Sequence, residues 1–100
     1  MRETQLQKQC LTWLKETHSD VCVGVNIHGG GYCNKGFPDL IVFTTTETIL
    51  VELKSKQSGY KIQPDQLIWK KRFENIGIRC LCVKSLSEFQ KIINSIVKKE

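Results

Sequence analysis

The stretch from Asp39 to Lys54, DLIVFTTTETILVELK, decides the fold. Two runs, residues 39–43 and 48–53, are rich in β-branched or large apolar residues and are separated by the short polar sequence TTTE. This pattern predicts an antiparallel β-hairpin. Both runs are apolar on both faces, so we expect helices on each side of the sheet that contains them.

The hairpin places two acidic residues close together. With Thr44–Glu47 as the loop, counting outward along the two strands predicts that Asp39 faces Glu52. Directly opposed side chains have Cβ atoms about 4.5–5.5 Å apart, where like charges repel each other. Lys54 follows Glu52 by two residues and therefore projects from the same face of the strand. Two carboxylates with an ammonium beside them suit a hard divalent cation and the hydrolysis of a phosphodiester.

Helices and strands are expected on both sides of the hairpin. Before it, apolar residues at helical spacing predict a helix over 3–17, and alternating apolar residues predict a strand over 21–27. The glycine-rich sequence HGGGYCNKG that follows predicts a loop. After the hairpin, the pattern predicts a helix over 63–76 and a strand over 79–84.

The helix over 63–76 should begin near Pro64 and end at Gly77. Four of its apolar side chains are expected to face the sheet: Leu67, Ile68, Phe73 and Ile76. Ser85, with Glu88 three residues later, forms the pattern of a capping box at the start of a final helix. That helix should bury Phe89, Ile92, Ile93 and Ile96.

The predicted order is helix, three strands, helix, strand, helix. A chain of 100 residues has room for one hydrophobic core, so residues 1–100 are expected to form a single domain. The fold class is α/β, with a mixed four-stranded sheet flanked by helices.

The composition indicates where in the cell the protein acts and what kind of partner it binds. No apolar run approaches the roughly 18 residues of a membrane span, and the start MRETQLQKQC lacks the apolar stretch of a signal peptide, so we expect a cytoplasmic protein with no membrane partner. The five cysteines form no CxxC pair, which favours reduced thiols over a zinc site. Residues 1–69 contain seven basic and seven acidic side chains, whereas residues 70–100 contain eight and three. The net charge of +5 favours a polyanionic partner.

The spacing Pro38-Asp39, twelve residues, then Glu52-Leu53-Lys54 resembles the PD-(D/E)xK signature of the restriction-endonuclease-like nuclease superfamily. A wider pattern is more specific, because D…ExK alone recurs by chance in many chains. That pattern resembles the VRR-NUC (virus-type replication-repair nuclease) family over nearly the whole chain. Its elements here are Glu3, GFPDLIVF, ILVELK, Gly59, Gln66, Trp69 and Gly77.

The resemblance implies a restriction-endonuclease-like core and assigns roles to particular residues. The implied metal ligands are Glu3, Asp39, Glu52 and the backbone carbonyl of Leu53. Mg²⁺ is the implied cofactor, with Mn²⁺ as a substitute. Lys54 would be the catalytic lysine, and Gln66 the accessory polar residue of the catalytic set. Two alternatives stay open: Glu3 could simply favour the start of a helix, and Gln63 competes with Gln66.

The resemblance also implies a substrate and an assembly. We expect a structure-selective DNA endonuclease that acts on branched DNA as a homodimer, like a Holliday-junction resolvase of phage replication and repair. If the protein is phage-encoded, it would act in the host cell cytoplasm. The residues expected to contact DNA are all basic: Lys35, Lys56, Lys61, Lys70, Lys71 and Arg72. Arg79 is a further candidate. The alternatives are a non-catalytic DNA-binding module, and a metal-dependent nuclease that acts on RNA or on other DNA structures.

Overall fold

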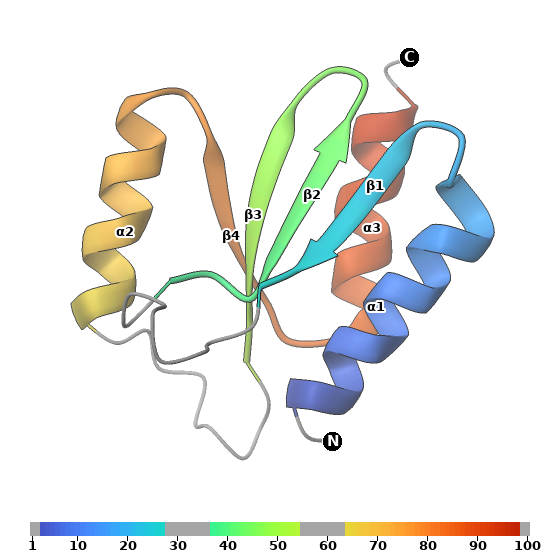
Figure 1. Ribbon diagram of the computed structural model, residues 1–100, viewed down its shortest axis with the longest axis horizontal. Coiled ribbons are helices and arrows are strands. Elements are labelled where there is room, and N and C mark those ends of the chain that lie inside the picture. The colour runs from blue at the N-terminus through green and yellow to red at the C-terminus, as the bar shows by residue number, and fades with distance from the viewer. Residues whose placement is uncertain (1–2, 28–36, 55–63, 99–100) are drawn as a thin grey trace.

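The computed structural model describes residues 3–27, 37–54 and 64–98 (Figure 1). The expected order of elements is confirmed, and each predicted boundary lies within one residue of the observed one. The elements are α1 (Glu3–His18), β1 (Cys22–Asn26), β2 (Leu40–Thr44), β3 (Thr48–Leu53), α2 (Pro64–Asn75), β4 (Arg79–Val83) and α3 (Leu86–Val97).

The four strands form one mixed sheet, as predicted, and they lie in the order β1-β2-β3-β4. β1 and β2 are antiparallel, as are β2 and β3, whereas β4 runs parallel to β3. A parallel neighbour requires a crossover connection, which α2 provides between β3 and β4. The crossover places α2 beside β4 (Figure 1), and Gln66 near the start of α2 contacts Glu52 at the carboxyl end of β3.

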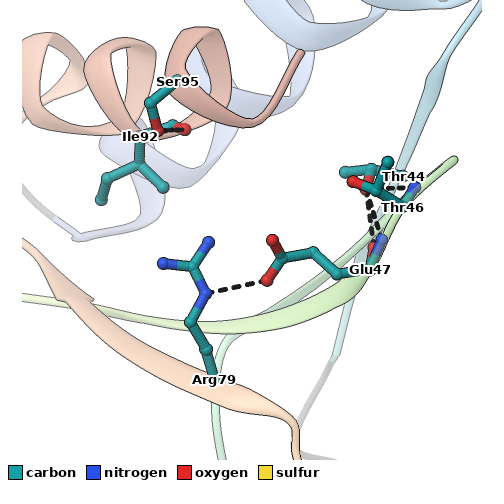
Figure 2. Close-up of polar contacts among 6 residues, drawn as sticks. All are labelled: Thr44, Thr46, Glu47, Arg79, Ile92 and Ser95. Carbon is teal, nitrogen blue, oxygen red and sulfur yellow. Dashed lines mark hydrogen bonds and ion pairs between the residues drawn. The ribbon is translucent and has the colours of Figure 1, made fainter. Parts of the chain in front are cut away.

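The β2–β3 hairpin has the predicted register, with Ile41 opposite Leu50. Its turn is closed by the hydroxyl of Thr44, which donates to the carbonyl of Glu47 at 2.7 Å and accepts from the N–H of Glu47 at 2.9 Å. The Glu47 carboxylate in turn accepts a 2.8 Å bond from Nε of Arg79 at the start of β4 (Figure 2). The turn is therefore tied to the neighbouring strand at the end of the sheet far from Glu52.

The hydrophobic core lies between one face of the sheet and the pair α1 and α3. Alternate residues of each strand point into it, as a period of two requires. The cap of α3 at Ser85 is confirmed, because Ser85 Oγ accepts from the N–H of Glu88 at 3.2 Å. The reciprocal bond of Glu88 is to the N–H of Lys84, one residue before the position that a capping box predicts. The buried cluster consists of Leu6, Cys10, Leu14, Cys22, Leu40, Val42, Ile49, Val51, Leu53, Val83, Phe89, Ile93 and Ile96.

Helices lie on both faces of the sheet, as expected, but among the described residues α2 covers the second face only near β3 and β4. α2 lies beside β4, and Val23 and Phe43 on β1 and β2 remain 59% and 45% exposed. The expected inward face of α2 is wrong for three of its four residues, because Leu67, Ile68 and Ile76 are exposed and no residue of α2 is buried. Phe73, the fourth, is half-buried and packs against Phe37.

Gly77 ends α2 with a φ of 85°, a conformation that glycine adopts without strain. No helix in the described ranges is long and apolar enough to cross a membrane.

Candidate active site

The end of β3 brings a carboxylate and an ammonium together. Glu52 is the second-last residue of β3, and Lys54 follows the strand directly. Lys54 Nζ lies 3.9 Å from Glu52 Oε1, and the two side chains are 7% and 17% exposed. Among the described residues, Lys54 is the only buried charged one. The predicted pair on one face of β3 is therefore present, with its cation almost fully removed from water.

A local irregularity of the hairpin brings Asp39 to the end of β3, where Glu52 and Lys54 lie. Leu40 is the register partner of Val51, yet the N–H of Asp39 also donates to the Val51 carbonyl at 3.0 Å. Two successive residues facing one residue of the partner strand are the mark of a β-bulge. The regular register ends at Leu40, so the expected direct pairing of Asp39 with Glu52 is replaced by this bulge.

The bulge directs the Asp39 side chain at the backbone of β3. Oδ2 of Asp39 accepts a 2.8 Å hydrogen bond from the N–H of Leu53, the residue between Glu52 and Lys54. The repulsion expected from two directly opposed carboxylates is thereby reduced. The Asp39 carbonyl accepts from the N–H of Ile27 at 2.8 Å and from Nε2 of Gln7 at 3.3 Å, so α1 and the end of β1 also hold this residue in place.

Gln66 on α2 completes the group from the other side. Its Nε2 donates to Glu52 Oε1 over 2.6 Å, so Gln66 contacts the acidic residues directly. Gln63 lies outside the described residues. A small pocket of about 30 Å³ opens beside the two residues. Its lining consists of Pro38, Leu50, Glu52, Gln66, Lys70, Cys80, Leu81 and Cys82.

Comparison with known proteins identifies the family. The family model of the VRR-NUC domain matches residues 1–86. The chain belongs to the VRR-NUC family. It is also similar to a solved structure of a VRR-NUC domain, with a TM-score of 0.68 and 28% sequence identity over 92% of this chain and 94% of that chain. No curated protein matches. The resemblance stated from the sequence motifs is confirmed, and with it a nuclease-type domain.

An aromatic cluster holds α2 of this VRR-NUC domain near the acidic residues. The ring of Phe37, two residues before Asp39, lies 5.0 Å from Trp69 and 5.7 Å from Phe73 between centroids. Trp69 and Phe73 stack on each other, and the guanidinium of Arg72 lies 4.7 Å from the Trp69 ring. Sequence reasoning missed this role of Phe37 and Phe73, although their aromatic character was a signal for it.

The predicted metal ligands of the VRR-NUC domain can be placed in part. Asp39, Glu52 and Leu53 adjoin one another, but the side chain of Glu3 lies outside what the structure describes. No group of three or more His, Cys, Asp or Glu residues within the described ranges gathers closely enough to hold a metal ion. Two carboxylates and a backbone carbonyl supply hard oxygen atoms only, which is the donor set that Mg²⁺ prefers. The residues present therefore fit such an ion, with Glu3 as the expected third acidic ligand.

The predicted DNA contacts fall into three groups. Lys70 lines the pocket, and Lys71 and Arg72 are exposed on the same helix. Arg79 pairs in register with Ile49, three residues from Glu52 and so about 10 Å along β3, where it binds Glu47 instead. The other three predicted contacts, Lys35, Lys56 and Lys61, lie outside the described residues. The same holds for the whole glycine-rich sequence 28–36, which was predicted to be a loop.

Two thiols lie beside the acidic residues but are not suited to act as nucleophiles. Cys82 is the register partner of Glu52, and both Cys80 and Cys82 line the pocket. Burial raises the pKa of each thiol; at Cys82 the Lys54 ammonium opposes this effect and Glu52 adds to it. Cys10, in the core, has a pKa raised to about 12 by burial. The thiol form dominates at neutral pH, and the thiolate is the nucleophilic form.

Proposed function

We propose that this VRR-NUC domain is a Mg²⁺-dependent, structure-selective DNA endonuclease that hydrolyses phosphodiester bonds. The observation that carries the proposal is the burial of Lys54 beside Glu52, with the Asp39 carboxylate bound to the backbone between them. Removing an ammonium from water is costly, and one carboxylate oxygen at 3.9 Å compensates that cost only in part. Unfavourable charge arrangements of this kind concentrate at functional sites.

Each residue of the group has a role that its position supports. Asp39, Glu52 and the carbonyl of Leu53 would hold the metal ion together with Glu3. The bound ion would lower the pKa of a water molecule and polarise the phosphate. Lys54 stabilises the negative charge that develops on the phosphate in the transition state.

Gln66 fixes the orientation of Glu52. The amide binds one oxygen of this carboxylate at 2.6 Å, and Lys54 approaches the same oxygen, Oε1. Both contacts limit rotation of the carboxylate about its last bond. Residues that hold a metal ligand in this way affect affinity or activity by about 10–100-fold when they are removed.

The preferred substrate is branched DNA, and the active form is a homodimer, as in Holliday-junction resolvases. Family membership supports this proposal, as does the excess positive charge of residues 70–100, which a dimer would double. A two-fold dimer places two sites symmetrically, and resolving a four-way junction requires two symmetric nicks. We extend the proposal to a role in phage replication or repair, which would be carried out in the host cytoplasm if the protein is phage-encoded.

One experiment tests class, metal and substrate together. The protein is incubated with single strands, duplexes, flaps and four-way junctions of DNA, and with matching RNA, in Mg²⁺, Mn²⁺ or EDTA. We expect paired nicks in the junction with either metal, little cutting of linear duplex, and none in EDTA. Glu52→Gln is the matched inactive control. Binding of DNA without cleavage under every condition would indicate a non-catalytic DNA-binding module. Faster cutting of RNA than of DNA would mean that RNA, and not DNA, is the substrate.

The proposed homodimer is tested by a separate measurement of molecular mass. Light scattering at micromolar concentration should give twice the mass of the 11.5 kDa chain. A mass of one chain, together with equal cutting of duplex and junction, would contradict the resolvase part of the proposal and leave the nuclease part standing.

A further inference from the structure

Lys70 differs in its surroundings from the two basic residues that follow it on α2. It lies one helical turn after Gln66, so both side chains project from the same face of the helix, and both line the pocket that contains Glu52. Lys71 is not among the residues of that pocket, and Arg72 lies over the ring of Trp69. Of the three consecutive cations, Lys70 is therefore the one that lines the pocket shared with Glu52.

The ammonium of Lys70 is held only weakly. It lies 4.0 Å from Oε2 of Glu74, and the two side chains are 41% and 47% exposed. An exposed pair four residues apart on a helix contributes little to stability, because water and salt screen it. A phosphate can replace such a partner at small cost, and it offers the stronger charge-assisted hydrogen bonds.

The size of the pocket determines where a nucleic acid can lie. About 30 Å³ admits a water molecule but not a nucleotide, so a bound strand would run across the mouth of the pocket rather than enter it. Lys54 belongs to the buried end of β3, with a side chain 7% exposed, whereas Lys70 is 41% exposed on α2. The two cations thus stand at different depths: Lys54 is paired with Glu52, and Lys70 lines the pocket that contains Glu52.

We propose that Lys70 binds a DNA backbone phosphate adjacent to the scissile one and thereby sets the position at which the strand is cut. This inference rests on the proposed nuclease function. Lys54 would act on the reacting phosphate from the buried end of β3, and Lys70 would hold the neighbouring phosphate from the side of α2. Lys70 is therefore a substrate-positioning residue, whose loss shifts the DNA relative to Asp39 and Glu52.

The test compares Lys70→Ala, Lys70→Arg and Lys91→Ala with the unmodified protein. Lys91 is an exposed lysine of α3, which packs on the opposite face of the sheet, so its removal changes the net charge equally. Binding to a fluorescein-labelled four-way junction is measured in EDTA over a range of salt concentrations. Cut positions are then mapped on sequencing gels in Mg²⁺. Thermal unfolding of each variant checks that it remains folded.

We expect Lys70→Ala to reduce the slope of log affinity against log salt by about 1, the loss of one phosphate contact, and to scatter the cut over neighbouring bonds. Lys70→Arg should keep the slope, and Lys91→Ala should match the unmodified protein in both measurements. An unchanged slope in Lys70→Ala, or the same loss in Lys91→Ala, would overturn the inference. Because binding is read without metal, an unmodified protein that binds but never cuts would refute the nuclease proposal and not the phosphate contact.

Discussion

Glu52 and Gln66 are joined by a 2.6 Å hydrogen bond between a strand of the sheet and the crossover helix that follows it. Helix α2 buries none of its residues, and this polar contact and the aromatic cluster around Trp69 help to fix the helix beside the acidic residues. The orientation of the Glu52 carboxylate consequently depends on a side chain that contributes little to the core.

Replacing Gln66 by alanine should slow DNA cleavage by about 10–100-fold, because Glu52 loses the group that fixes its orientation. Affinity for DNA in EDTA should change little, since no charge is removed. Single-turnover kinetics separates the two quantities, and Gln90→Ala on α3 serves as the matched control. A cleavage rate within twofold of the unmodified protein would show that Lys54 alone orients the carboxylate.

Lys54→Ala should bind a four-way junction almost normally and cleave it at least ~100-fold more slowly, which is the scale of losing one donor that stabilises developing charge. We expect Lys54→Arg to restore little of the rate, because a planar guanidinium does not fit the space of a buried ammonium. The measurements are binding in EDTA and single-turnover cleavage in Mg²⁺. Normal turnover of the alanine variant would remove Lys54 from the mechanism.

The ion pair of Glu52 and Lys54 should appear in the stability of the metal-free protein. Glu52→Gln leaves a buried ammonium without its carboxylate, so the free energy of unfolding should fall by about 1–3 kcal/mol. Adding Lys54→Met to that variant removes the uncompensated charge and should recover most of the loss. Urea unfolding of both single variants and the double variant gives the coupling energy. Additive effects would mean that the two side chains do not interact despite the 3.9 Å separation.

Gly24 permits the close approach of α1 to β1. A Cβ atom at this position would lie 2.8 Å from Cδ2 of Leu14 and 2.9 Å from Cδ2 of Leu11, and Leu14 is itself buried. Gly24→Val should therefore destabilise the fold by about 1–3 kcal/mol through overpacking. Val23→Ala, at a position that is 59% exposed, should change stability by less than about 0.5 kcal/mol. Equal urea midpoints for the two variants would contradict this account.

The sequence was sufficient to predict the elements whose pattern of apolar residues and whose turn or cap residues are clear. The pairing of Ile41 with Leu50 followed from the length of the hairpin loop, and the start of α3 followed from Ser85 and Glu88. The proximity of Glu52, Lys54 and Gln66 also agrees with prediction, because strand periodicity and family motifs both point to it. The roles assigned to these residues remain predictions.

Two features could not be read from the sequence, each for a physical reason. The bulge at Asp39 depends on a side-chain bond to the Leu53 N–H, and such a bond follows from three-dimensional geometry rather than from a pattern of residue types. The orientation of α2 was mispredicted because helical periodicity assumes that apolar residues face the sheet. Here the helix turns Gln66 and Lys70 toward the pocket and leaves Ile68 and Ile76 exposed.

The absence of any buried residue in α2 has a consequence for the motions of the protein. Segments with few buried apolar contacts open at a lower free energy than the core, in units that often coincide with single elements. Helix α2 should therefore detach while α1 and α3 stay packed on the sheet, and its backbone amides should exchange with deuterium sooner than theirs. Each such opening would withdraw Gln66 and Lys70 from Glu52 and leave Asp39 and Lys54 in place. The catalytic group would then be assembled and dispersed in a folded molecule, and hydrogen exchange of this one helix would report the fraction of time that it is dispersed.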